Sequence, residues 1–303
     1  MTTATRPVSG RSLVEGAGEP RDTRLGEFLQ ARRALLSPEA AGVRTYGRRR
    51  VPGLRREELA QLAGVSVDYY VRLEQGRAHH PSAEVLDALA RALQLEEVER
   101  NHLHELAAPA PVRRRAPAPE RVRPAVHQLL ERFDSVPAFV LGRRMDLLAW
   151  NRLAAALIGD PGRLPPGRRN MAWLTFLDPA TRSLYADWER VARETVGYLR
   201  HCAGRNPDDS ELAALVGELS LKSEQFARWW GGHLVREKTH GTKRMIHPAV
   251  GELTLNYETL VLSGESEQAL ITYTAEPGSS SETALQLLAA WTAPALGERV
   301  PAP

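Results

Sequence analysis

The sequence predicts two domains, an all-α domain of five helices followed by an α+β domain with a five-stranded antiparallel sheet and helices. Three observations support this prediction. Apolar residues recur at helical spacing, between capping residues, as far as Ala107. The stretch APAPVRRRAPAP at 108–119 has no apolar period and is typical of a semi-rigid linker. Beyond Thr242 the apolar period changes to two, as in strands.

The composition is that of a globular protein, which we expect to be cytoplasmic. Of 303 residues, 43% are hydrophobic and 25% are charged. No apolar run approaches the roughly 20 residues that cross a membrane. Residues 1–21 lack the apolar core of a signal peptide and are expected to form a flexible arm. The single cysteine, Cys202, cannot form an internal disulfide and is either a buried inert thiol or a redox switch.

Charge differs between the two expected domains, which we place at 22–107 and 120–295, with a tail at 296–303. Residues 1–119 contain 19 arginines, no lysine and 15 acids, a net charge of +4. Residues 120–303 contain 21 basic and 22 acidic residues, a net charge of −1. This excess is too small to indicate a nucleic-acid partner by itself. Its position is more informative, because six arginines lie between Ser37 and Arg56 with one acid.

In the first domain we expect a helix capped by Asp22 or Thr23 and running to Leu35, with Leu25, Phe28, Leu29 and Leu35 on its apolar side. After a Gly- and Pro-punctuated loop, residues 54–76 suggest two short helices joined by a tight turn at Gly64. Ser66 caps the second of these, which runs to about Gln75. Helices capped by Ser82 and near 97–107 complete the five.

The second short helix has one apolar and one polar face. Tyr70 and Leu73 point the same way and should be buried. Asp68 and Arg72 lie on the opposite face, from which an arginine can reach guanine in a major groove. As an i, i+4 pair of opposite charge, the two could instead only decorate a solvated face. The turn, the spacing and the flanking residues together favour the DNA-reading interpretation.

This segment resembles the helix-turn-helix of the XRE group of phage-repressor-like regulators, whose pattern is E-L-A-x-x-A-G-V-S-x-x-Y-x-x-x-x-E-x-G followed by P-S. The residues in register are Glu58, Leu59, Ala60, Ala63, Gly64, Val65, Ser66, Tyr69, Glu74, Gly76, Pro81 and Ser82. The resemblance implies that this domain is repressor-like and binds double-stranded DNA. It implies base-reading positions at Val67, Asp68 and Arg72 on the second short helix, called the reading helix, with Ser66 and Tyr69 as further DNA contacts. It implies phosphate contacts at Arg56, at the start of the first short helix, and at Arg77, just past the second.

The expected DNA contacts include one acidic residue and one run of arginines. Asp68 is an unusual base reader, because a carboxylate accepts only from a cytosine amino group and repels phosphate. Its role would be to orient Arg72. The run Arg48, Arg49 and Arg50 is either a solvated loop or a set of phosphate contacts, and its place beside the reading helix favours phosphate.

The second domain is expected to begin with a helix at 120–133 and a hairpin of strands at 138–141 and 147–150. A short helix through Ile158 and two or three helices within 182–232 follow, broken near 204–209 and 220–223. Three consecutive strands come next, one of them with alternating Leu253, Leu255, Tyr257, Thr259 and Val261. A last helix covers 281–291. We expect the helices to lie on one face of the sheet.

This half resembles the ligand-binding domain of MmyB-like regulators in the runs AFVLGRRMDLLAWNRLAAALIGD, RNMAWLTFLDPATRSLYADWE, GTKRMIHPAVGELTLNYETL and YTAEPGS. The resemblance implies a PAS-like fold, a homodimer, and an apolar small ligand such as a fatty acid. Large apolar residues at sheet- or helix-facing positions are the candidate ligand contacts, although each could simply belong to the core. They are Phe139, Leu141, Trp150, Trp173, Phe176, Trp188, Trp229, Leu255 and Tyr257. The candidate anchors for a carboxylate head group are Arg143, Arg144 and His233.

The sequence contains no motif that indicates a catalytic or metal site. The chain has no G-x-S-x-G, P-loop, G-x-G-x-x-G or zinc-type Cys/His spacing. His102 and His104 are two apart on a helix and therefore point to different faces. We expect no catalytic residue, no metal and no cofactor other than the fatty-acid-like ligand. The leading hypothesis is thus a ligand-responsive transcription factor, and the alternative is a constitutive DNA-binding protein with a protein-interaction module or small enzyme at its C-terminus.

Overall fold

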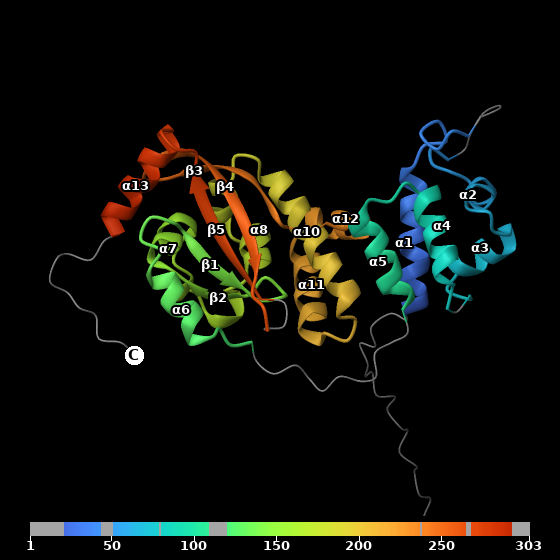
Figure 1. Cartoon of the computed structure of the whole chain (residues 1–303), viewed down its shortest axis with the longest axis horizontal. Coiled ribbons are helices and arrows are strands. Elements are labelled where there is room, and N and C mark those ends of the chain that lie inside the picture. The colour runs from blue at the N-terminus through green and yellow to red at the C-terminus, as the bar shows by residue number, and fades with distance from the viewer. Residues whose placement is uncertain are drawn as a thin grey trace, which may run out of the picture.

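The computed structural model describes residues 21–43, 51–78, 80–108, 120–236, 238–264 and 268–292. Residues 1–20 of the expected arm, nearly all of the expected linker and the tail lie outside these ranges, whereas residue 21 belongs to the first helix. Figure 1 shows two lobes, a helical head and a larger lobe built on a sheet. Within the described residues, no helix is both long and apolar enough to cross a membrane.

The head contains the five predicted helices. Residues Leu25, Phe28, Leu29, Leu59, Tyr70, Leu73, Leu86, Leu89 and Leu103 form the centre of its core. The elements are α1 (Arg21–Leu35), α2 (Arg56–Ala63), α3 (Val67–Glu74), α4 (Ala83–Ala92) and α5 (Glu97–Ala107).

Two details of the first predicted helix are wrong. Asp22 and Thr23 lie inside α1, which already begins at Arg21, so neither caps it. Leu35 is 68% exposed, because it lies at the last position of the helix, beyond the turns that pack on the core.

The turn between α2 and α3 follows from its residues. Gly64 has a φ of 68°, in the left-handed region where a Cβ is unfavourable, and it ends α2. The Ser66 hydroxyl accepts a hydrogen bond from the Tyr69 amide at 3.2 Å and so caps α3. These two devices fix the direction of α3 relative to α2.

The second lobe is built on a five-stranded antiparallel sheet in the order β2-β1-β5-β4-β3. The strands are β1 (Ala138–Leu141), β2 (Leu147–Trp150), β3 (His240–His247), β4 (Gly251–Val261) and β5 (Ala269–Ala275). The last three form a meander, and β1 pairs with β5, with Phe139 opposite Ile271. The N-terminal hairpin therefore extends the sheet beyond the C-terminal strand.

The helices cover both faces of the sheet, which corrects the expectation of one covered face. The larger core lies between one face and α7 (Arg152–Ile158), α8 (Met171–Leu177), α9 (Pro179–Leu184), α10 (Trp188–Arg205), α11 (Ser210–Lys222), α12 (Glu224–Gly231) and α13 (Ser280–Thr292). On the other face, α6 (Pro124–Glu131) packs against Ala138, Val140, Ala149 and Leu270.

Several sequence predictions for this lobe need correction. The helix expected from residue 120 begins at Pro124, since proline is favoured in the first helical turn. Helices α8 and α9 were not predicted. Short 3₁₀ turns, Pro161–Arg163 and Pro166–Arg168, occupy the Pro/Gly-rich loop. Val261 is 76% exposed because it lies at the end of β4, beyond the core that buries Leu253 and Leu255.

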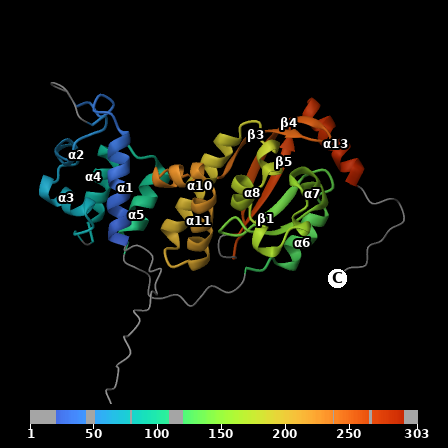
Figure 2. The ribbon, with the colours of Figure 1, turned by 180° about the vertical axis from the view of Figure 1, so that it is seen from behind.

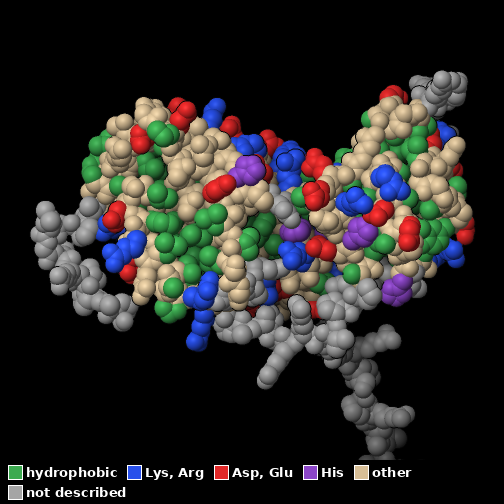
Figure 3. All heavy atoms as spheres, in the orientation of Figure 1, with side chains coloured by type: hydrophobic (Ala, Val, Ile, Leu, Met, Phe, Trp, Pro, Cys, Tyr) green, Lys and Arg blue, Asp and Glu red, His purple; other side chains and the backbone are tan. Residues whose placement is uncertain are grey.

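The two lobes meet where α5 of the head packs against α10. Val235, from the segment after α12, is buried within the core of the head. Figure 3 shows a notch in the outline between the two lobes. In Figures 1 and 2, α3 lies at the end of the molecule farthest from the sheet, so the reading helix faces away from the second lobe.

Candidate nucleic-acid interface and ligand cavity

The outer face of α3 carries the predicted base-reading residues, and it is open to solvent. Val67 is 41% exposed, and the side chains of Asp68 and Arg72 are 85% and 53% exposed. The Arg72 Nε lies 3.5 Å from the Asp68 carboxylate. Such an exposed pair adds little stability. The opposite face buries Tyr70 and Leu73.

A buried carboxylate anchors α3 to the rest of the head. Glu74 accepts hydrogen bonds from Tyr70 Oη at 2.6 Å, from Arg33 Nε at 2.6 Å and from Arg56 Nε at 2.6 Å. Burial by itself raises the pKa of Glu74, but the bonds from Arg33, Tyr70 and Arg56 outweigh it and lower this pKa. The same carboxylate, together with burial, raises the pKa of Tyr70. Glu74 therefore stays ionised and ties three helices together.

The predicted phosphate contacts differ in how accessible they are. Arg77 follows α3 and is exposed. Arg56 donates to Glu74 through Nε, and its side chain remains 44% exposed. Arg56 therefore has a structural role, and part of its side chain remains accessible to solvent. Arg48, Arg49 and Arg50 lie outside the described residues.

A partly open cavity of about 60 Å³ lies between the sheet, α8, α10 and Tyr185, which follows α9. Three of the predicted ligand contacts, Phe139, Leu141 and Tyr257, line it. The remaining wall is mostly apolar and includes Met145, Met171, Thr175, Tyr185, Val191, Tyr198, Thr259, Ala269, Ile271 and Tyr273.

Two lysines also line this cavity, Lys238 and Lys243. Lys243 lies on the core-facing side of β3, forms an ion pair with Glu194 at 3.1 Å, and has its ammonium 4.9 Å from the centroid of the Tyr257 ring. Lys238 donates to the Thr195 hydroxyl at 2.8 Å. Among the described residues, no carboxylate lies within ion-pair distance of the Lys238 ammonium.

Burial shifts the pKa values of the groups around the cavity. It lowers the pKa of Lys238 well below its ordinary value and lowers that of Lys243 even though Glu194 opposes the shift. Burial also raises the pKa of Tyr185 to about 12. An ammonium in such a place is favoured by a nearby anion. The cavity therefore combines apolar walls with lysine amines whose charged form an anion would stabilise.

The other predicted ligand contacts lie elsewhere. Phe176 packs edge to face with Trp188, Phe226 and Trp229 in an aromatic cluster between α8, α10 and α12. Trp150 lines a surface crevice beside α6, and the indole of Trp173 lies by Glu218 on α11. Leu255 is fully buried in the core. For these residues the core interpretation is the one that the structure supports.

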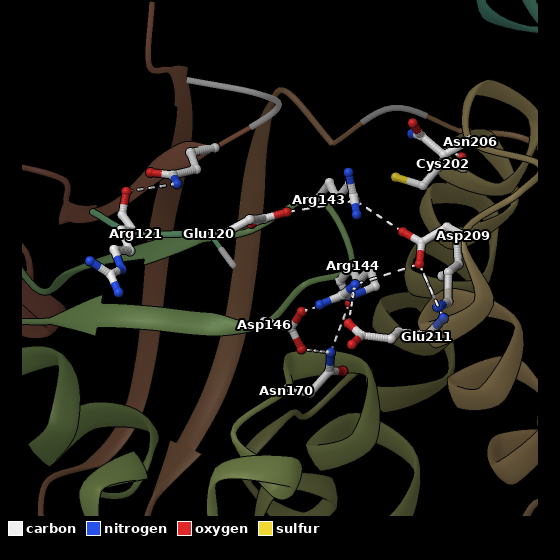
Figure 4. Close-up of polar contacts among 12 residues, drawn as sticks. Glu120, Arg121, Arg143, Arg144, Asp146, Asn170, Cys202, Asn206, Asp209 and Glu211 are labelled. Carbon is white, nitrogen blue, oxygen red and sulfur yellow. Dashed lines mark hydrogen bonds and ion pairs between the residues drawn. The ribbon is translucent and has the colours of Figure 1, made fainter. Parts of the chain in front are cut away.

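The predicted head-group anchors do not line the cavity. Figure 4 shows Arg143 and Arg144 in a polar network between the β1–β2 turn and the start of α11. Arg143 pairs with Asp209 at 2.9 Å, and Arg144 pairs with Asp146 at 3.1 Å. Both guanidinium groups are thus engaged by carboxylates. His233 instead lies at the junction of the lobes, with Nδ1 3.2 Å from Arg200.

Lys238, Lys243 and Glu74 were missed as site residues. A usable signal existed for Lys243, because it shares the alternation of Met245 and His247 on a strand whose other face is polar. The rarity of lysine is a second signal for Lys238 and Lys243. Together with Lys222 they are the only lysines in an arginine-rich chain. Glu74 lies one turn after Tyr70, on the buried face of its helix.

Comparison with family models assigns both lobes. Residues 24–103 match a helix-turn-helix domain. Residues 122–288 match the MmyB-like transcription regulator ligand binding domain, which is more than half of the chain. A comparison with curated proteins finds no significant match. The chain therefore belongs to the MmyB-like transcription regulators, and it combines a DNA-binding head with a ligand-binding domain.

Proposed function

We propose that this protein is a homodimeric transcription factor that reads DNA with α3 and responds to an anionic amphiphile, such as a fatty acid, bound between the sheet and α10. The observation that carries the ligand class is the placement of Lys238, beside the Glu194-paired Lys243, at a mostly apolar cavity. Apolar walls favour a hydrocarbon chain, and the ammonium favours a carboxylate.

The cavity must enlarge to hold such a ligand. At about 60 Å³ it is far smaller than the roughly 300–1,000 Å³ typical of small-molecule sites. Met145 and Met171 line it, and their unbranched side chains change shape readily. Ligand entry would therefore move the helices that cover the sheet, and α10 is the helix that also contacts the head.

In DNA binding, the exposed face of α3 would enter the major groove. Arg72 would contact a base there, and Arg56 and Arg77 would contact phosphates. In a homodimer, two copies of α3 would occupy successive major grooves about 34 Å apart on a near-palindromic site. The ligand changes operator affinity only if it binds one arrangement of the heads more tightly than the other.

The lysines provide a matched test of the ligand class. Binding of dodecanoate and of the neutral dodecanol to the delipidated full chain is measured by displacement of a fluorescent fatty-acid analogue. We expect dodecanoate to bind about ten- to a hundredfold more tightly, because hydrogen bonds to charged groups contribute about 1.5–3 kcal/mol. Lys238→Met should remove this preference. Lys222→Met changes an exposed lysine and should retain it. Equal binding of acid and alcohol by the wild type would contradict an anionic ligand.

Native mass spectrometry provides an independent check. Protein purified from cells should carry a lipid-sized mass that is released on denaturation. Delipidation should then change operator affinity. An operator affinity that is the same with and without the released compound would contradict ligand control of DNA binding.

A further inference from the structure

Two histidines from different lobes face each other at the junction. His102 lies on α5 of the head, and His201 lies on α10 of the ligand-binding lobe. They are 3% and 7% exposed. Neither residue belongs to the reading helix or to the apolar cavity. They come together because α5 packs directly on α10.

The His102 ring is held in one place from two sides. Phe28 of α1 meets it edge to face, with the ring centroids 5.2 Å apart. Gly204 of α10 lies so close that a Cβ there would be 2.4 Å from His102 Nδ1. Among the described residues, this buried nitrogen has no hydrogen-bond partner. A buried polar nitrogen without a partner is costly, so its position requires an explanation.

A carboxylate lies beside the same nitrogen. Glu105 is three residues after His102, so both side chains project from one face of α5. One carboxylate oxygen, Oε2, lies 3.9 Å from His102 Nδ1 and is likewise buried without a hydrogen-bond partner among the described residues. The other, Oε1, lies 3.5 Å from the Arg205 guanidinium. The carboxylate is thus oriented by Arg205 and leaves one oxygen for another partner.

From these contacts we infer that His102, Glu105 and His201 form a binding site for a divalent transition-metal ion, with zinc the best match. One donor atom from each residue lies within 4.8 Å of the donors of the other two. Donors around tetrahedral zinc stand about 3.4 Å apart, because Zn–N and Zn–O bonds are about 2.0–2.1 Å long. His102 Nδ1 and Glu105 Oε2, 3.9 Å apart, need to close by only about 0.5 Å, and no pair of donors needs to close by more than about 1.4 Å.

The donor set and its surroundings suit zinc. Two imidazoles and one carboxylate are ligands that Zn²⁺ accepts, with a water molecule in the fourth position. The Arg205 contact would orient the ligating carboxylate from the second coordination shell. A crevice of about 740 Å³ that reaches His102 provides an entry path for the ion.

The location gives such an ion a mechanical role. Two ligands come from the DNA-binding head and one from α10, so the ion would clamp the lobes in a single relative orientation. Its binding would require the junction to be closed. The metal would then stabilise one head arrangement over others by binding that arrangement more tightly. Spacing along the chain could not reveal this site, because His201 follows Glu105 by almost a hundred residues.

The test uses the full-length chain without a histidine tag, dialysed against buffer containing micromolar free Zn²⁺. Bound zinc is counted by plasma mass spectrometry, and affinity is measured by calorimetry with ZnCl₂. Co²⁺ is added in place of zinc to record its visible absorption, which distinguishes tetrahedral coordination. We expect one Zn²⁺ per chain and a tetrahedral Co²⁺ spectrum.

Variants then locate the site. Glu105→Gln and His201→Asn should each weaken Zn²⁺ binding at least about tenfold. His104→Asn changes a neighbouring histidine that pairs with Asp87 on another face, and it should bind like the wild type. Circular dichroism confirms that each variant is folded, and Glu105→Gln is the mildest because that side chain is partly exposed. Absence of zinc from the wild type, or equal binding by Glu105→Gln and His201→Asn, would overturn the proposal. A loss in His104→Asn equal to theirs would also overturn it.

Discussion

Arg72 is the residue on which the proposed base reading depends. It projects from the exposed face of α3, and Asp68 holds its guanidinium at 3.5 Å. Replacing it with alanine should cost about 1–3 kcal/mol of binding free energy on the preferred operator and relax discrimination at one base pair. Binding titrations on the operator and on its single-base variants measure both effects. Equal losses on all sequences would show that Arg72 contacts only the backbone of the DNA.

Glu74 stabilises the head through hydrogen bonds from three residues, Arg33, Arg56 and Tyr70. Glu74→Gln removes the charge that faces Arg33 and Arg56 and should lower the free energy of unfolding by about 3 kcal/mol. Glu57→Gln, an exposed glutamate on α2, is the control and should have little effect. Chemical denaturation of both variants makes the comparison. Equal midpoints for the two would contradict the role of Glu74.

The same residue predicts a pH dependence. The folded-state pKa of Glu74 lies below its ordinary value of 4.5. Its stabilising contribution is therefore complete above pH 4.5 and is lost as the pH falls through the lowered value. The difference in stability between the wild type and Glu74→Gln should shrink on acidification below pH 4.5. A difference that stays constant down to pH 2 would show that the ionised carboxylate is not responsible.

At the scale of elements, the contact between α5 and α10 depends on a glycine. A Cβ on Gly204 would lie 2.3 Å from His102 Cε1, so Gly204→Ala should push the two helices apart and lower the melting temperature. Gly217 on α11 has no atom within 4 Å of the equivalent position. Gly217→Ala should leave the melting temperature unchanged or raise it, because alanine inside a helix is about 0.5–1 kcal/mol more stable than glycine. Scanning calorimetry of the two variants tests this packing, and a harmless Gly204→Ala would contradict it.

The elements also show what a sequence can predict. The hairpin strands, α5 and the turn of the helix-turn-helix follow from local patterns, namely period two, capping residues and a glycine at the turn. The predicted start of α6 at residue 120 is wrong, because Pro124 favours the first turn of a helix and begins α6 there. The cavity could not be predicted, since aromatic residues that fill a core and residues that line a hole have the same composition. Phe139 lines the cavity, whereas Phe176 packs on Phe226 in the core, and only the folded structure distinguishes these two places.

At the scale of the whole molecule, α10 connects the two functions. It borders the apolar cavity through Val191 and Tyr198, and it contacts the head through α5. A ligand that enlarges the cavity would therefore act on the helix that positions the head. Helix shifts of one or two ångströms at interfaces are a common means of transmitting binding. The helix-turn-helix motif predicted the head and the MmyB-like runs predicted the ligand domain, but neither indicated this connection.

The most direct test of the account is selection of bound sequences from random DNA duplexes by the full chain at near-physiological salt, with dodecanoate present and after delipidation. The account predicts enrichment of a near-palindrome whose half-sites lie about 34 Å apart, in one of the two conditions more than in the other. It also predicts that Arg72→Ala loses the preference at one base pair of each half-site. No sequence preference in either condition would contradict the central claim that α3 reads DNA under ligand control.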